Sequence, residues 1–160
     1  MTPEEKDLLL KELHSKWPHG VKILHKGWNY EWDDELSTIE RVVGIDEDFI
    51  YTKVIDVHNG EEYRDDKRLI DTFDDKLFLR PMSSITEEEI SDLRKINSQF
   101  WFDKFGNFAY VGAADDGFCS VEEMGNILNY LDSKYLDYRG LIEKSLAIKV
   151  TEENNPYNIT

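Results

Sequence analysis

Apolar residues recur at helical spacing in three segments of the chain, and each segment follows residues that can cap a helix. Before the first segment, Thr2 and Glu5 can form a capping box, and Pro3 suits the first helical position. The proline and glycine within residues 18–20 end the pattern. The apolar face of this helix consists of Leu9, Leu10, Leu13 and Trp17.

Two further helices are expected in the second half of the chain. Thr86 can cap the second helix, whose first turn is rich in glutamate. Ser120 and Glu123 form a capping box before the third helix. The third helix has the clearest period, so we expect it to pack centrally, with Leu128→Ala costing roughly 2–5 kcal/mol. Its apolar stripe is Met124, Ile127, Leu128, Leu131 and Tyr135.

Alternating, β-branched and aromatic runs predict strands in the rest of the chain. Tight turns are expected at residues 46–48, at Asn59-Gly60 and at residues 105–107. In the second strand, Ile39, Val43 and Ile45 share one face, with a basic residue among them. The expected strands cover residues 21–25, 38–45, 49–57, 61–64, 76–79, 107–111 and 145–150.

This order of elements predicts the fold class. Strands are neighbours in sequence and do not alternate with helices, which favours an α+β fold. We expect a mainly antiparallel sheet of about five strands with three helices packed on it. Residues 1–152 are expected to form one domain, and residues 153–160 a flexible tail.

An excess of acidic residues is the main departure from average composition. The 160 residues include 34 acidic and 19 basic side chains, for a net charge of −15. The excess is even, with net −8 in residues 1–80 and −7 in residues 81–160. Such a charge repels nucleic acid and membranes, so we expect neither as a direct partner. It favours a basic protein partner, unless it serves solubility alone.

Cysteine usage and the N-terminal residues bear on the compartment. The single cysteine, Cys119, excludes an intrachain disulfide and fits a reducing compartment. The first residues are acidic where a signal peptide needs basic and apolar residues, and no apolar run approaches the ~20 residues of a membrane helix. We therefore expect a cytoplasmic protein.

Motifs of catalysis and cofactor binding are absent from the sequence. There is no phosphate-binding glycine loop, nucleophile elbow, HExxH or CxxC motif. The four histidines lack zinc-ligand spacing, and none of the acidic pairs closes a calcium loop. We expect no catalytic residue, cofactor or metal, and we interpret Cys119 as a small apolar residue rather than a nucleophile.

Aromatic residues gather in two places. Residues 28–32 (WNYEW) place three rings on one face of an extended chain. A packed strand face and a surface that stacks on sugars or bases would both use such a ladder. The aromatic residues between positions 100 and 110 predict a core hairpin beneath the third helix.

Three segments carry a resemblance to a known group of proteins. They are residues 1–10 (MTPEEKDLLL), 79–89 (LRPMSSITEEE) and 137–147 (DYRGLIEKSLA). In these segments the chain resembles short uncharacterised proteins of gut Bacteroidales and of their phages and mobile elements. The resemblance implies a cytoplasmic bacterial or phage setting and an accessory or anti-defence role. In the last segment, Gly140 suits the left-handed position after the third helix, with Leu141 folded back on that helix.

Together these features predict a non-enzymatic, acidic accessory protein that binds a basic protein partner. Encoded by a phage or mobile element, it would act on host or defence proteins. Two alternatives stay open: an acidic mimic of nucleic acid that inhibits a DNA-binding protein, and a divalent-metal-dependent enzyme. The candidate partner-binding residues are Asp115, Asp116, Glu122, Glu123 and Arg139.

Because no acidic cluster has the spacing of a coordination sphere, we predict that no divalent ion binds specifically. Calorimetric titration with magnesium, calcium, manganese and zinc should show no site tighter than roughly 100 μM, weaker than calcium-sensor sites. A stoichiometric isotherm in the micromolar range would contradict this prediction and favour the metal-dependent enzyme.

Overall fold

The predicted helices and strands assemble into an α+β fold, which confirms the class expected from the sequence. The computed structural model describes residues 1–29, 34–56, 58–98, 100–102, 108–110 and 120–158. The helices are α1 (Pro3–Lys16), α2 (Glu87–Ile96) and α3 (Val121–Ser133). The strands are β1 (Lys22–Asn29), β2 (Asp34–Ile45), β3 (Phe49–Ile55), β4 (Glu62–Leu69), β5 (Lys76–Leu79), β6 (Phe100–Phe102), β7 (Phe108–Tyr110) and β8 (Ala147–Lys149).

The main sheet has the strand order β4-β3-β2-β1-β5-β8, while β6 pairs with β7. Its neighbouring strands are antiparallel except β5 and β8, which are parallel. Two predicted turns are confirmed. The Asp46 carboxylate accepts hydrogen bonds from the backbone N–H groups of Asp48 (2.9 Å) and Phe49 (2.8 Å). Gly60 has a φ of +73°, in the left-handed region that favours glycine. The turn expected at residues 105–107 lies outside the described residues.

The apolar residues that the sequence groups on one face of β2 are not its most buried residues. Glu40 and Val42 are fully buried, whereas Ile39 and Val43 are partly exposed. The grouping followed the apolar residues, whereas the buried face of β2 carries a glutamate beside a valine. A glutamate is tolerated on the inner face here because its carboxylate is paired with the Arg68 guanidinium from β4.

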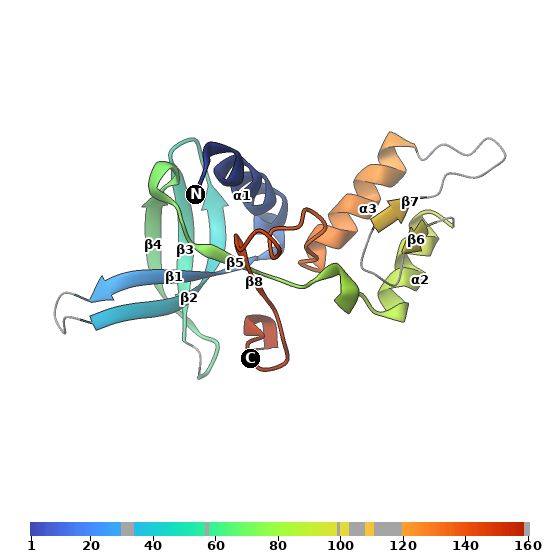
Figure 1. Ribbon diagram of the computed structural model, residues 1–160. Coiled ribbons are helices and arrows are strands. Elements are labelled where there is room, and N and C mark those ends of the chain that lie inside the picture. The colour runs from blue at the N-terminus through green and yellow to red at the C-terminus, as the bar shows by residue number, and fades with distance from the viewer. Residues whose placement is uncertain (30–33, 57, 99, 103–107, 111–119, 159–160) are drawn as a thin grey trace.

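Helix α1 covers one face of the sheet (Figure 1). Both hydrogen bonds of the predicted Thr2–Glu5 capping box are present, and Pro3 is the first helical residue. The helix is followed by a short 3-10 turn that ends at Gly20, where φ is +79°. The core between α1 and the sheet consists of Leu9, Leu13, Val21, Ile23, Val42, Ile50, Phe73, Leu77, Leu79, Leu141, Leu146 and Ala147.

Helices α2 and α3 form a second cluster beside the sheet, called here the helical lobe (Figure 1). The expectation that all three helices pack on the sheet is therefore wrong for these two. The apolar stripe of α3 packs against α2 and Phe100 of β6 instead, so its apolar side chains are buried within the helical lobe. The fully or largely buried residues of this second core are Met82, Leu93, Phe100, Ile127, Leu131 and Leu136.

The end of α3 differs from the prediction. Tyr135, with a φ of +56°, takes the left-handed position directly after the helix. Its N–H bonds to Asp132 O (3.0 Å) and the N–H of Leu136 bonds to Leu131 O (3.1 Å), which is the Schellman pattern. Gly140 is also left-handed, at +73°, but it lies in a later turn.

The segment expected to be a flexible tail is anchored to the sheet at Pro156 and Tyr157. The Tyr157 ring stacks on the Tyr135 ring at 4.0 Å between centroids. Its hydroxyl donates to Phe78 O (2.8 Å), and burial raises its pKa. The Lys22 ammonium donates to Pro156 O (2.6 Å). The stacked Tyr157 ring and a hydrogen bond from the Tyr135 hydroxyl to His19 O hold Tyr135, which helps a non-glycine residue keep the left-handed position.

The burial of α3 residues sets a test of the second core. Leu131 is fully buried, whereas Leu128 is half-buried and lies outside both apolar clusters. We therefore predict that Leu131→Ala destabilises the protein by roughly 2–5 kcal/mol and that Leu128→Ala costs clearly less. Urea unfolding followed by far-ultraviolet circular dichroism measures both. Equal losses would place the core on a different face of α3.

Candidate functional site

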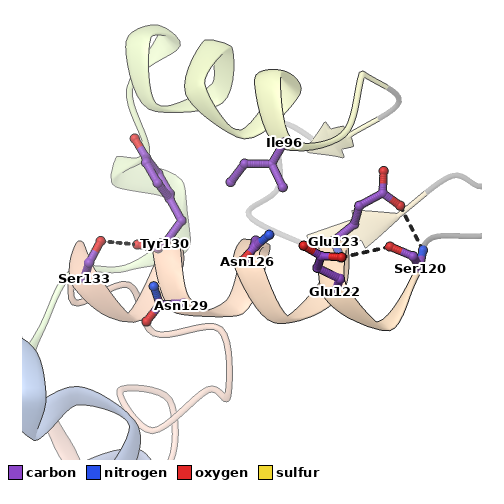
Figure 2. Close-up of a pocket in the computed structure, with 8 residues that line it drawn as sticks. All are labelled: Ile96, Ser120, Glu122, Glu123, Asn126, Asn129, Tyr130 and Ser133. Carbon is purple, nitrogen blue, oxygen red and sulfur yellow. Dashed lines mark hydrogen bonds between the residues drawn. The ribbon is translucent and has the colours of Figure 1, made fainter.

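A surface pocket lies between α2 and α3 in the helical lobe (Figure 2). Most of its lining comes from the outer side of α3, and Ile96 at the end of α2 supplies an apolar wall. The lining residues are Ile96, Ser120, Glu122, Glu123, Asn126, Asn129, Tyr130 and Ser133.

The capping box of α3 forms one end of this pocket. The Ser120 hydroxyl accepts a hydrogen bond from the Glu123 N–H (3.0 Å), and the Glu123 carboxylate accepts one from the Ser120 N–H (2.8 Å). The backbone hydrogen bond from Ser120 is the main reason that the pKa of Glu123 is lowered. Glu123 is thus ionised and held in place, while its neighbour Glu122 is exposed at the same helix end.

A hydrogen bond between the two helices forms the other end. The Tyr130 hydroxyl of α3 donates to the Asp92 carboxylate of α2 (3.1 Å), and Asp92 also accepts from Lys95 (2.6 Å). Burial, together with the Asp92 carboxylate, raises the pKa of Tyr130 to about 12. The tyrosine therefore stays neutral and acts as a donor that ties α3 to α2.

Between these ends, the outer side of α3 carries a row of polar residues. Glu122, Asn126, Asn129 and Ser133 follow one another at intervals of four, three and four residues, so they share one face of the helix. This row offers oxygen acceptors at each turn. Among the lining residues that the structure describes there is no histidine or cysteine.

The surrounding helices carry a local excess of acid. Over their described lengths, α2 and α3 have seven acidic and two basic side chains, and both bases lie on α2. Two of the predicted partner-binding residues, Glu122 and Glu123, therefore lie together in the pocket. Asp115 and Asp116, predicted to extend the same patch, lie outside the described residues.

Arg139, the remaining predicted residue, lies elsewhere. Its guanidinium donates to the Glu12 carboxylate of α1 and to the Ser15 hydroxyl (3.0 Å). Lys16 completes this cluster, with its ammonium 2.9 Å from Glu12 Oε1 and 2.6 Å from Asp132 Oδ1. Glu12 and Lys16 are fully buried. Arg139 therefore serves the contact between α1 and α3 rather than the pocket.

A polar network on the inner face of the sheet was missed by the sequence reasoning. Arg68 donates to both oxygens of the Glu40 carboxylate at 2.6 Å, and Thr52 donates to Glu40 at 2.6 Å. The Nε atom of Arg68 also lies 3.5 Å from Asp75, whose other oxygen is 2.8 Å from His25 Nδ1. Local sequence carries no signal for this network, because its members come from five separate segments.

The two buried carboxylates of this network are shifted in opposite directions. Burial raises the pKa of Asp75, and the hydrogen bond from His25 offsets only part of that effect. Burial alone would also raise the pKa of Glu40, but hydrogen bonds from Arg68, Thr52 and Thr38 outweigh it and lower the pKa. Glu40 is therefore the ionised anchor of the network.

The lowered pKa of Glu40 predicts an acid-dependent loss of stability. Its contribution is complete above the ordinary glutamate pKa of 4.5 and is lost as the pH falls through the lower pKa of the folded state. We predict that Glu40→Gln destabilises the protein by roughly 2–4 kcal/mol at neutral pH, because Arg68 loses its main partner. The difference from the wild type should shrink in acid. Urea unfolding across this pH range measures it, with the exposed Glu87→Gln as control. Parallel pH curves for wild type and Glu40→Gln would contradict the assignment.

Comparison with known proteins identifies no relative of this chain. Among the described residues, no helix is long and apolar enough to cross a membrane, and no group of three or more histidine, cysteine, aspartate or glutamate residues is placed to hold a metal ion. No protein-family model, no curated protein and no solved structure matches the chain.

Proposed function

We propose that the protein is a non-enzymatic, acidic protein-binding module whose pocket between α2 and α3 takes a basic segment of a partner protein. The observation that carries this proposal is the row Glu122, Asn126, Asn129 and Ser133 along α3, set in helices with a clear excess of acid. A basic segment laid along this row would find an oxygen acceptor for its lysine and arginine side chains at each helical turn.

The composition of the row favours a peptide over the alternative of mimicking nucleic acid. A mimic needs carboxylates spaced like phosphates, because recognition of the phosphate backbone depends on repeated charge. In this row one carboxylate is followed by two amides and a hydroxyl. Amides both donate and accept, so they suit the backbone and side chains of a polypeptide.

The setting of this activity is part of the same proposal. The single cysteine supports a reducing, cytoplasmic compartment. The resemblance of three segments to proteins of Bacteroidales phages and mobile elements supports an accessory role, directed at a host or defence protein. A basic nucleic-acid-binding protein is the partner class that the charge favours.

The test uses a lysine-rich peptide and nuclear magnetic resonance. The side-chain amide signals of Asn126 and Asn129 should shift on titration, and Glu122→Lys should weaken binding about three- to tenfold. Each exposed ion pair contributes roughly 0.2–1 kcal/mol, and the reversal replaces attraction with repulsion.

Glu4→Lys is the matched control. Glu4 is exposed and holds the second helical position of α1, as Glu122 does in α3, but it lies on the sheet side of the molecule. It should leave the affinity nearly unchanged. Equal losses in the two variants would show that the peptide responds to net charge and not to the pocket.

A further inference from the structure

A glycine lies near the middle of α3, and no contact among the described residues requires it. Gly125 is the fifth residue of this 13-residue helix and is exposed. A Cβ atom placed on it would meet no atom of the described residues within 4 Å. Glycine in a helix interior is destabilising by roughly 0.5–1 kcal/mol relative to alanine. Neither crowding nor a left-handed backbone requires glycine at this position.

An exposed apolar side chain lies one turn before it. Val121 is 92% exposed, the largest value among the exposed large hydrophobic residues of the described chain. The four-residue spacing puts Val121 and Gly125 on the same side of α3, and Asn129 follows at the same spacing. Val121, Gly125 and Asn129 thus form a strip beside the polar row that begins at Glu122. Together they make one continuous exposed face of α3, called here the glycine face, which consists of Val121, Glu122, Gly125, Asn126 and Asn129.

We propose that the glycine face receives a basic α-helix of the partner protein, packed closely across Gly125. This inference rests on the proposed function and names the shape of the partner. A residue without a side chain lets a second helix approach more closely than the usual 8–10 Å between axes. Val121 would supply an apolar contact at one end of the crossing, and the amides of Asn126 and Asn129 would bond to polar groups beside it.

Charge complementarity identifies the occupant as basic. α3 carries Glu122, Glu123 and Asp132 and no lysine or arginine. Asp132 is occupied by Lys16, and Glu123 caps the helix, which leaves Glu122 as the carboxylate at the exposed end of the glycine face. A second copy of this acidic chain would meet like charge here, so a basic helix from another protein fits the face better.

Gly125→Ala separates a binding role from a structural one. The added methyl group should raise the urea midpoint of the free protein, because alanine favours the helix. It should also weaken binding of the partner helix about tenfold, as for overpacking of a close contact. A glycine without a binding role would show the gain in stability and no loss of affinity. Ser91→Ala, a change at an exposed site on α2, should leave the affinity unchanged.

The probe is an amphipathic peptide of leucine and lysine at helical spacing, compared with a peptide of the same composition that a central proline prevents from forming a helix. We expect the helical peptide to bind more tightly to the full chain and to lose this advantage on Gly125→Ala. Binding that depends on Glu122 but is indifferent to Gly125→Ala overturns the glycine face and leaves the proposed function standing. Binding indifferent to both Glu122→Lys and Gly125→Ala overturns both, as does the absence of binding by either peptide.

Discussion

Four charged side chains meet at the contact between α1 and α3, and the placement of the helical lobe depends on them. Lys16 and Glu12 are fully buried, Asp132 is nearly so, and Arg139 closes the cluster from the following turn. Buried charges are tolerated only when each one has a partner. Burial of these four side chains is therefore favourable only in the arrangement of α1 and α3 that pairs them. The Tyr138 ring lies 4.9 Å from the Lys16 ammonium and 4.5 Å from the Arg139 guanidinium, and so limits access of water to both. The cluster thus specifies geometry more than it adds stability.

The parts of the fold that depend on local sequence could be predicted. Both predicted capping boxes form, and the predicted cap Thr86 completes a third, because a capping serine or threonine and the glutamate three positions later need nothing from the rest of the chain. The turn at Asp46 and the one at Gly60 are local in the same sense. The parallel pairing of β5 with β8 was not predicted, because it joins segments about seventy residues apart across the whole helical lobe.

The candidate site was predictable in part for the same reason. Glu122 and Glu123 were found because charge and helix period place them together on the surface. The pairing of Arg139 with the buried Glu12 of α1 could not be predicted, because the two residues are 127 positions apart in sequence. The network at Glu40 follows the same rule, since its guanidinium partner is 28 residues away. A charged residue can be buried when another residue pairs with it, and a partner distant in sequence leaves no local pattern.

The backbone at Arg80 shows that the helical lobe is an insertion in the sheet. The N–H of Arg80 bonds to Tyr135 O and its carbonyl accepts from the N–H of Asp137, each at 2.8 Å, so the chain leaves and re-enters at adjacent points. The buried apolar residues described between these points pack in a cluster of their own. Substitutions and changes of length within residues 82–133 can therefore accumulate while the strand order is kept, provided that Asp132 still meets Lys16. Such an architecture lets natural selection alter the pocket between α2 and α3 on an unchanged scaffold.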